Sequence, residues 1–357
     1  LFKMRRTQDL PDKESATMFF QDCKLSHQAH ITGISHSVKE ILPPDLLDLT
    51  QLQKEANIRY GYTASEVYDI AQSLYEKKLI SYPRTSSRYL TEDVFDSLPQ
   101  IMARLLSWEL LPAAKGTGGI DISNLSRHVI SAEKANVHHA IIITGIRPGN
   151  LSEKEMQVYR LVAGRMLETF MPPCRIETTN VEAVCAAQHF KAEQTRIIEA
   201  GWHDVFMHSD MIPTSGYSVK ELPEVEKGDT LNVCGCNMVH KKQLPVNPFT
   251  DAELVEYMEQ NGLGTVSSRT NIIRTLVNRR YIRYSGKYIV PTPKGMFTYE
   301  TIRGKKIADT SLTADWEKQL AGLESGMITG QDFLNRIRTL AKEMTDDIFN
   351  TYSTKEE

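Results

Sequence analysis

The sequence predicts a multidomain protein of the α+β class. Its 357 residues are more than one ordinary domain needs. Three capping boxes, in which Ser or Thr is followed three positions later by Glu, each precede apolar residues at helical spacing; they begin at Thr63, Ser152 and Thr250. Between residues 175 and 244 the pattern changes to short alternating apolar runs, which are typical of strands. Helical and strand-rich stretches thus occupy separate parts of the chain, as in α+β proteins.

The composition is that of an ordinary folded protein, with 41% hydrophobic and 24% charged residues. No run of about 18 apolar residues occurs, and the first residues lack the apolar core of a signal peptide, so nothing indicates a membrane or secretion. The five cysteines include no C-x-x-C pair, which excludes a zinc ribbon and favours a reduced, cytoplasmic setting. Cys234 and Cys236 could bind a soft metal, but two neighbouring strand positions are the more ordinary interpretation.

The elements before the strand-rich stretch are mainly helical. The first 42 residues are mixed and polar. The helix that starts at Thr63 ends near Lys77, and residues 79–83 continue as an extended segment. The helix that starts at Ser152 is expected to run to about Phe170, because two prolines follow it.

The last part of the chain has the outline of a winged helix, a common DNA-docking unit. A helix ended by Asn261 and Gly262 is followed by a second helix, and residues 281–284 and 287–290 then predict a β-hairpin. The net charge is −3, but residues 264–306 carry ten basic residues against the single acid Glu300. Such a run is often only a solvated surface, yet its coincidence with helix and hairpin favours contact with phosphate.

Two segments of the chain show a weak similarity to each other. Lys77–Tyr82 parallels Arg279–Tyr284 in its placement after a helix. We interpret the parallel as shared winged-helix geometry, without inferring a sequence repeat.

The segment around Tyr82 could carry phosphoryl-transfer chemistry. A tyrosine can attack a phosphodiester and store the bond energy as a phosphotyrosine ester, although forming a phenolate at pH 7 ordinarily costs roughly 4 kcal/mol. Pro83 favours an extended backbone before it, so Arg84, two positions on, is expected on the same side as Tyr82. Its guanidinium could hold the phosphate, and Thr85 and Ser87 offer further hydrogen bonds. Taken alone, however, such a segment is more often a plain strand end.

Four segments resemble those of one family. Gln72–Thr85 closely resembles the active-site segment of type IA topoisomerases, nearest the topoisomerase III branch. Val137–Thr144, Asn261–Arg269 and Leu312–Glu317 resemble further blocks of that family, in the same order and spacing.

The resemblance implies roles for individual residues. Tyr82 would be the nucleophile that becomes linked to the 5′ phosphate of one strand, and Arg84 would position it and stabilise the phosphate. His138 would contact the phosphate of the cleaved strand, with His139 the weaker candidate of a pair that is often structural in other proteins. The residues expected to bind single-stranded DNA are Thr85, Ser87, Arg88, His139, Thr265, Ser267, Ser268 and Arg269. A helix beginning near Ser267 would also offer free amides to a phosphate.

The chain departs from the family pattern in several places. Ser86 stands where the family usually has Asp, and Ile143 and Val266 each replace Pro. No Asp-x-Asp cluster occurs, whereas the family binds Mg²⁺ through such a cluster in an N-terminal Toprim domain. We therefore expect the chain to be part of a longer protein, or the product of a gene without that domain. We expect no metal site in this chain, and we expect it to bind single-stranded DNA but cleave it poorly alone.

The implied architecture is a toroid fragment of three domains around a hole. Residues 1–42 and 170–245 would form a β-rich arch, 43–169 a helical gate domain with the nucleophile, and 246–357 a second helical, winged-helix-like domain. The function implied is that of an ATP-independent isomerase acting in the cytoplasm at the nucleoid, with single-stranded DNA as substrate and a RecQ-type helicase as a candidate partner.

Two other classes of function stay open. The first alternative is a non-catalytic single-stranded-DNA-binding or winged-helix regulatory module, which fits the basic segment but leaves the Tyr82 segment unexplained. A tyrosine recombinase is disfavoured because none of the ten histidines has Arg three positions on. Tyr284 is a second possible nucleophile, but neither Pro nor Arg follows it.

Overall fold

The computed structural model describes residues 1–108, 110–111, 120–135, 138–206, 215–239 and 247–353. Val137, the first residue of one family-like segment, lies outside them. The chain divides into two compact units. The sheet unit comprises Leu1–Pro44, Glu109–Ser126 and Met166–Pro245, and the helical unit comprises Asp45–Trp108, Arg127–Arg165 and Val246–Glu357.

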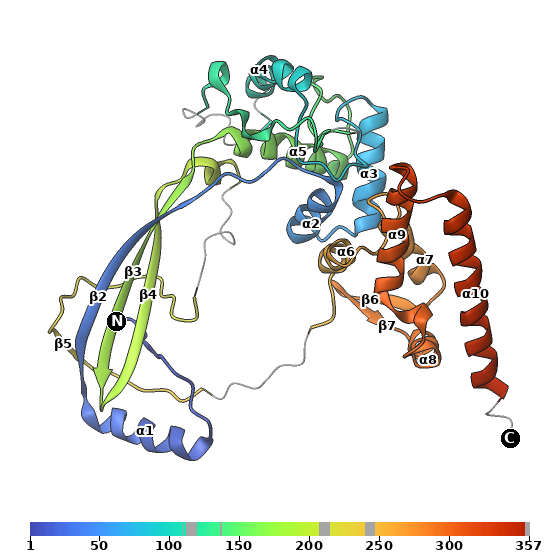
Figure 1. The fold of residues 1–357 in the computed structure, drawn as a ribbon. Coiled ribbons are helices and arrows are strands. Elements are labelled where there is room, and N and C mark those ends of the chain that lie inside the picture. The colour runs from blue at the N-terminus through green and yellow to red at the C-terminus, as the bar shows by residue number, and fades with distance from the viewer. Residues whose placement is uncertain (109, 112–119, 136–137, 207–214, 240–246, 354–357) are drawn as a thin grey trace. The chain divides into compact units, whose positions relative to one another are not determined.

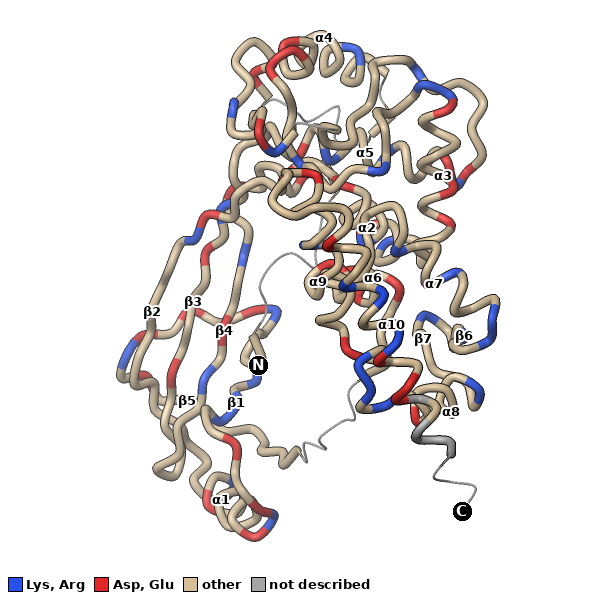
Figure 2. The backbone as a smooth tube through the Cα atoms, turned by 45° about the vertical axis from the view of Figure 1, so that its right-hand side comes forward, with Lys and Arg blue, Asp and Glu red and all other residues tan. Residues whose placement is uncertain are grey.

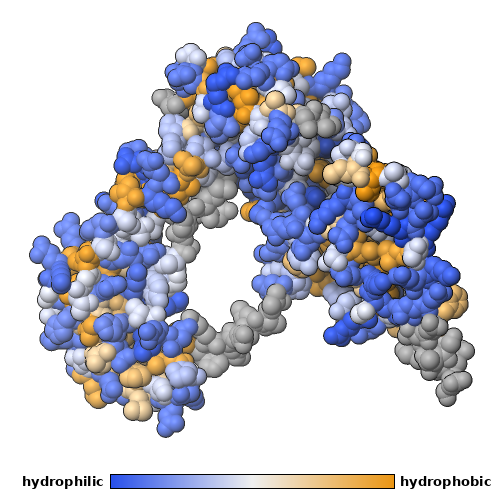
Figure 3. All heavy atoms as spheres, in the orientation of Figure 1, coloured by the Kyte–Doolittle hydropathy of each residue, from blue (hydrophilic) through white to orange (hydrophobic). Residues whose placement is uncertain are grey.

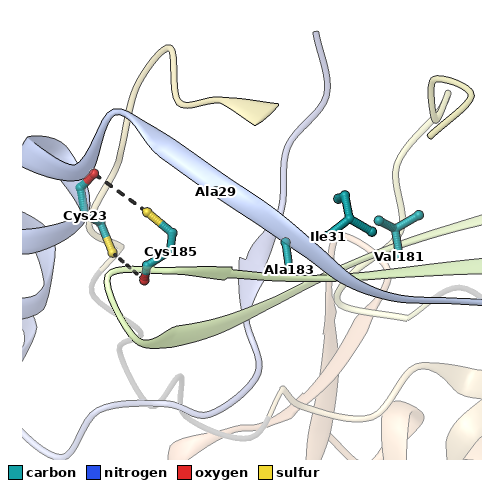
Figure 4. Close-up of a cluster of buried hydrophobic side chains, with 6 residues drawn as sticks. All are labelled: Cys23, Ala29, Ile31, Val181, Ala183 and Cys185. Atoms are coloured by element: carbon teal, nitrogen blue, oxygen red, sulfur yellow. Dashed lines mark hydrogen bonds between the residues drawn. The ribbon is translucent and has the colours of Figure 1, made fainter. Parts of the chain in front are cut away.

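The sheet unit is built on a five-stranded antiparallel sheet in the order β1-β4-β3-β2-β5 (Figure 1). The strands are β1 (Arg5–Arg6), β2 (Gln28–Ile41), β3 (Cys174–Cys185), β4 (Gln188–Glu199) and β5 (Thr230–Asn232). One helix, α1 (Lys13–Ser26), precedes β2. Figure 4 shows the apolar cluster where α1 meets the sheet, with the Cys23 and Cys185 thiols each directed at the other residue's carbonyl oxygen. Burial raises the pKa of Cys23 to about 12, so this thiol stays protonated and acts as packing.

The strand-rich prediction is confirmed for this unit, with three differences. The strands β2 to β4 are long and continuous instead of short, and α1 was not expected in the mixed, polar first segment. The helix forms because Asp12 accepts the amide hydrogen of Ser15 at its start, while only one side chain of α1, Cys23, is fully buried. Cys234 and Cys236 follow β5 and do not lie on a strand, because strand pairing with β2 ends at Asn232.

The helical unit contains most of the helices and a small two-stranded sheet. Its elements are α2 (Leu49–Tyr60), α3 (Ala64–Glu76), α4 (Glu92–Ser107), α5 (Glu153–Phe170, whose end lies in the sheet unit), α6 (Asp251–Gln260), α7 (Arg269–Asn278), β6 (Ile282–Ser285), β7 (Tyr288–Pro291), α8 (Pro293–Ile302), α9 (Thr310–Glu324) and α10 (Gly330–Ser353). Short 3-10 turns occur at Arg127–Val129 and Lys306–Ala308 in this unit, and at Ile122–Asn124 and Gly201–Val205 in the sheet unit.

All three capping boxes are present. At the start of α3, Thr63 and Glu66 exchange hydrogen bonds of 2.9 and 3.2 Å between side chain and backbone amide. The same reciprocal pair forms between Ser152 and Glu155 and at the start of α6. These boxes satisfy amides that a helix start leaves without a partner, which is why the three starts could be placed from sequence.

The core of the helical unit joins segments that are distant in sequence. Ala64, Val255, Met258, Ile273 and Ile289 form one buried cluster, so α3, α6, α7 and β7 pack together. The predicted hairpin is confirmed one residue later than expected in each strand, and the helix–turn–hairpin outline of a winged helix is confirmed with it. Figure 3 shows hydrophilic side chains over most of the visible face of this unit. No described helix is long and apolar enough to span a membrane.

Candidate active site

The backbone after α3 carries Tyr82 into position. Lys78 adopts a left-handed conformation with φ 60°, and its amide donates to the Tyr75 carbonyl at 2.8 Å, which ends the helix. A short antiparallel bridge follows, in which Ile80 pairs with Ile143. Both isoleucines are fully buried, so the bridge is anchored in the core and Tyr82 emerges at its end.

Two hydroxyl groups hold this bridge. The Ser81 hydroxyl donates to the Ala140 carbonyl and accepts from the Ile142 amide, both at 3.0 Å. The Thr144 hydroxyl donates to the Lys78 carbonyl at 2.6 Å. The hydrogen bonds that frame the bridge come from the amides of Ser81 and Thr144, so the bridge requires no amide from residue 143. This explains how Ile143 can stand where the related family has Pro.

The ring of Tyr82 stands at the edge of an open hollow. It is half-buried, lies edge-on to the Tyr75 ring with centroids 5.3 Å apart, and lies 4.5 Å from the His138 ring. The hollow has a volume of about 520 Å³. Its lining consists of Tyr75, Glu76, Lys78, Ile80, Ser81, Tyr82, His139 and Thr144. The phenol is therefore not enclosed in an apolar interior.

Arg84 lies along the same face of α3. Its guanidinium is 5.1 Å from the centroid of the Tyr68 ring and donates to the Gln72 side-chain oxygen at 3.3 Å. Tyr68, Gln72 and Tyr75 lie on one face of α3. Arg84 therefore lies beside the helix turns that come before Tyr75, the residue whose ring contacts Tyr82. No hydrogen bond between Arg84 and Tyr82 is present in the described structure. The Nε atom of Arg84 is buried and has no hydrogen-bond partner there, which leaves a strong donor without an acceptor.

The two histidines differ in their surroundings. His138 is exposed, and its carbonyl accepts the Thr85 hydroxyl at 3.0 Å. Nδ1 of His139 lies 2.7 Å from the Ala140 carbonyl oxygen, which can only accept, so this nitrogen carries the hydrogen. His138 thus contacts the Tyr82 ring directly, whereas His139 lines the hollow beside it.

Thr85, Ser87 and Arg88 are used within the protein. Thr85 and Ser87 are buried, and the Thr85 hydroxyl accepts the Ser87 amide at 3.0 Å. Arg88 pairs with the buried carboxylate of Asp48 at 2.7 Å. Asp48 also accepts the Gln51 amide at the start of α2, so these contacts tie the loop after Tyr82 to that helix. Contact of these side chains with phosphate stays a prediction.

The segment before α7 forms a tight turn. Gly264 has φ 69°, and a Cβ there would lie 2.8 Å from the Ser268 hydroxyl oxygen. That hydroxyl accepts the Thr265 amide at 2.8 Å, and Arg269 is buried and paired with Glu259 at 3.2 Å. Thr265 and Ser267 are the exposed members of the predicted group.

The described residues offer no evident metal site. Among them, no group of three or more His, Cys, Asp or Glu side chains could hold a metal ion. The hollow at Tyr82 contributes one carboxylate, Glu76. The residues present therefore do not fit a Mg²⁺ site, and we assign none to them.

Comparison with known proteins covers most of the chain. Residues 2–335 match the family model described as DNA topoisomerase. The chain belongs to this family. It is 32% identical over 344 residues to DNA topoisomerase 3 of Bacillus licheniformis, which covers 90% of this chain and 47% of that protein. It is 30% identical over 352 residues to the Bacillus subtilis protein of the same name, covering 92% and 48%. The type IA, topoisomerase III-like resemblance is confirmed.

A solved structure has the same fold. Full-length topoisomerase I from Thermotoga maritima superposes with a TM-score of 0.73 at 22% identity, covering 96% of this chain and 56% of that chain. The topoisomerase-like α+β fold is thereby confirmed. The chain of this topoisomerase family member spans about half the length of the curated relatives it matches.

Sequence reasoning missed several residues that shape the site. Tyr68 holds the Arg84 guanidinium, and Ser81 and Thr144 fix the backbone on either side of the bridge. A signal existed for the first of these. Tyr68, Gln72 and Tyr75 recur at helical spacing, as a stripe separate from the buried Val67, Ala71 and Leu74.

Proposed function

We propose that the protein to which this chain belongs is a type IA, topoisomerase III-like DNA topoisomerase, and that Tyr82 is its nucleophile. One observation supports this most directly. The Tyr82 ring borders an open hollow and contacts the exposed ring of His138, and the Arg84 guanidinium lies along the same face of α3. A strand backbone supplies the phosphate oxygens that such donors bind.

The proposed step is a transesterification. The Tyr82 phenol oxygen attacks phosphorus, the bond from phosphorus to the 3′ oxygen breaks, and the phenol loses its proton while the leaving 3′ oxygen gains one. The strand then carries a 5′-phosphotyrosine ester, and attack by the 3′ hydroxyl reverses each change, so no ATP is needed. Arg84 and the exposed His138 ring would donate hydrogen bonds to the phosphate oxygens as charge develops.

The predicted DNA-binding residues divide into two groups in this proposal. Thr265, Ser267 and His139 retain exposed or hollow-facing side chains, so they would contact the strand. The remaining members are engaged within the protein and would position the site, namely Thr85, Ser87, Arg88, Ser268 and Arg269.

Features of the whole protein belong to the same proposal. The division into an arch (1–42 and 170–245), a gate domain (43–169) and a winged-helix-like domain (246–357) follows from the family resemblance. So do the use of Mg²⁺ held by a Toprim domain, strand passage between single-stranded DNA regions, action at the nucleoid, and partnership with a RecQ-type helicase.

The nucleophile can be tested by covalent trapping. A 3′-labelled single-stranded oligonucleotide would be incubated with Mg²⁺, this chain and a Toprim-containing fragment of a relative, then resolved on a denaturing gel. We expect a labelled protein–DNA band that disappears in Tyr82→Phe. Tyr284→Phe is the matched control, since that phenol is half-buried beside Asp251, its pKa is raised, and it should not react. We expect little or no labelled band from the chain alone.

Two outcomes would contradict the proposal. A band that persists in Tyr82→Phe would place the nucleophile elsewhere. Binding of the oligonucleotide with no band, in a mixture where an intact relative does form one, would instead favour the non-catalytic DNA-binding module.

A further inference from the structure

The backbone after α7 repeats the hydrogen bonds of the backbone after α3. In each case the residue that caps the helix is followed by a basic residue in a left-handed conformation, Lys78 at φ 60° and Arg280 at φ 61°. The amides of these two residues donate to Tyr75 at 2.8 Å and to Val277 at 2.9 Å. The next amides, of Leu79 and Tyr281, donate to Leu74 and Leu276, both at 2.9 Å.

We call the backbone segment after α3 the first copy and the one after α7 the second copy. In both copies the partner strand is held in the same way. Thr144 donates from its hydroxyl to the Lys78 carbonyl, and Thr292 donates to the Arg280 carbonyl, each at 2.6 Å. The residue before each threonine is the strand partner, which gives the pairs Ile80–Ile143 and Ile282–Pro291. The weak sequence similarity between Lys77–Tyr82 and Arg279–Tyr284 therefore reflects a shared local structure. In this structure Tyr284 is the counterpart of Tyr82.

The second copy does not retain a reactive phenol. Tyr284 is half-buried beside the buried side chain of Asp251. Burial first, and then the neighbouring Asp251 carboxyl, raise the pKa of the Tyr284 hydroxyl above its ordinary value. In the first copy the phenol ring instead borders the hollow.

Three positions that line the Tyr82 hollow in the first copy correspond to cationic residues in the second copy. Lys78 and Ser81 correspond to Arg280 and Arg283, and counting back from the two threonines makes Lys287 the counterpart of His139. All three of these cations, Arg280, Arg283 and Lys287, are exposed. Lys287 lies 5.4 Å from the centroid of the Tyr288 ring, and within the described residues none of the three has an ion-pair partner.

The surroundings of these cations hold little opposing charge. Residues 270–299 contain no Asp or Glu. Figure 2 shows basic residues on the turns at either end of β6. The hairpin register places Tyr284 and Ile289 as a pair packed toward the core, so Arg283 points from the opposite face. All three cations are thus exposed, on the hairpin or on the turn before it, and we call them together the wing site.

We propose that the wing site, Arg280, Arg283 and Lys287, is a second DNA site that binds backbone phosphates without performing chemistry. The inference rests on the proposal that the protein acts on DNA. Three exposed cations without acidic partners attract an anionic polymer, and each phosphate contact releases condensed counterions. The same backbone device would then serve cleavage in one copy and binding in the other.

The test is the salt dependence of DNA binding, measured by fluorescence anisotropy with the 357-residue chain in a Tyr82→Phe background, so that cleavage plays no part. A labelled single strand and a labelled duplex distinguish the two sources of phosphate. The variant is Arg280→Gln/Arg283→Gln/Lys287→Gln. The matched control is Arg127→Gln/Arg303→Gln/Lys306→Gln, which removes the same charge from residues that pair with Glu92, Glu300 and Glu343.

The expected result is a flatter plot of log affinity against log salt for the wing variant. With about 0.7 counterions released per contact on a single strand and about 0.9 on a duplex, the slope should fall by about 2 or about 2.7. The control should keep the slope of the parent. Equal slopes for parent, control and wing variant on both ligands would overturn the wing site. If covalent trapping fails but the wing variant still shows the smaller salt slope, only the role of Tyr82 is refuted.

Discussion

Replacing Gly295 by Ala should unfold the winged helix at a lower temperature than any nearby glycine change. Gly295 lies in the first turn of α8, where the helix approaches the strand that follows α7. A Cβ at this position would lie 2.0 Å from the Tyr281 carbonyl oxygen and 2.9 Å from its carbonyl carbon. Both are backbone atoms, so no side-chain rotation can relieve the overlap, and the helix and the strand must move apart.

The size of the effect follows from what that movement breaks. The Tyr281 carbonyl accepts the amide of Thr292 at 3.0 Å, and the Gly295 amide donates to the Thr292 hydroxyl at 3.1 Å. Losing two such bonds costs about 2 kcal/mol, and overpacking adds roughly 1–3 kcal/mol. The better helix propensity of Ala returns about 1 kcal/mol, so the net loss is about 3 kcal/mol. For a unit of this size that lowers the melting temperature by about 6–12 °C.

The assay is thermal unfolding followed by far-ultraviolet circular dichroism. Gly330→Ala is the control, because Gly330 begins α10 and a Cβ there meets no atom within 4 Å. The control should unfold at or slightly above the parent temperature. Gly295→Ala should also flatten the salt dependence of DNA binding, since the displaced strand carries Arg283 of the wing site. A Gly295→Ala protein that melts within about 1 °C of the parent would refute the reasoning.

Three further predictions concern named contacts. Hydrogen bonds, from Lys77 first, lower the pKa of Glu155 to about 2, so its stabilisation is complete above about pH 4.5 and is lost as the pH falls toward 2. Urea unfolding of Glu155→Gln should therefore show a deficit of roughly 1–2 kcal/mol at pH 7 that shrinks across this range. Tyr284→Phe should lose about 1 kcal/mol, because it leaves the buried Asp251 carboxyl without the neighbouring hydroxyl, and an unchanged urea midpoint would count against that interaction. Gly264→Ala should lose about 2 kcal/mol, because φ is 69° and the added Cβ would crowd the turn before α7; a midpoint equal to the parent's would show that the turn adapts.

Much of the local structure could be predicted because its causes are local. Each capping box needs only two residues three positions apart, and all three starts were placed correctly. The hairpin of β6 and β7 was displaced by one residue, which is the usual uncertainty where a turn sets the register. The three-domain division stays a prediction beside the two compact units.

The side-chain partners in the candidate site could not be predicted, because they come from distant parts of the chain. Arg88 pairs with Asp48 and Arg269 with Glu259, and each pairing depends on how α2 and α6 pack. The spacing of Tyr82 and Arg84 predicted a shared side, but it gave no hint that Tyr68 would hold the guanidinium. Thr85 is likewise buried, and its hydroxyl bonds to the backbone of His138 within the protein, which the sequence did not predict.

The two copies of the backbone device explain how one structural solution can serve two tasks. In both, a left-handed basic residue and a threonine hydroxyl fix the end of a strand, and this part depends on neither tyrosine. The neighbours of the two phenols differ, because one lies beside the buried Asp251 while the other borders an open hollow. A strand cut by the proposed reaction stays covalently attached on its 5′-phosphate side only. Any further hold on the DNA must be non-covalent, and exposed cations without acidic partners are suited to provide it.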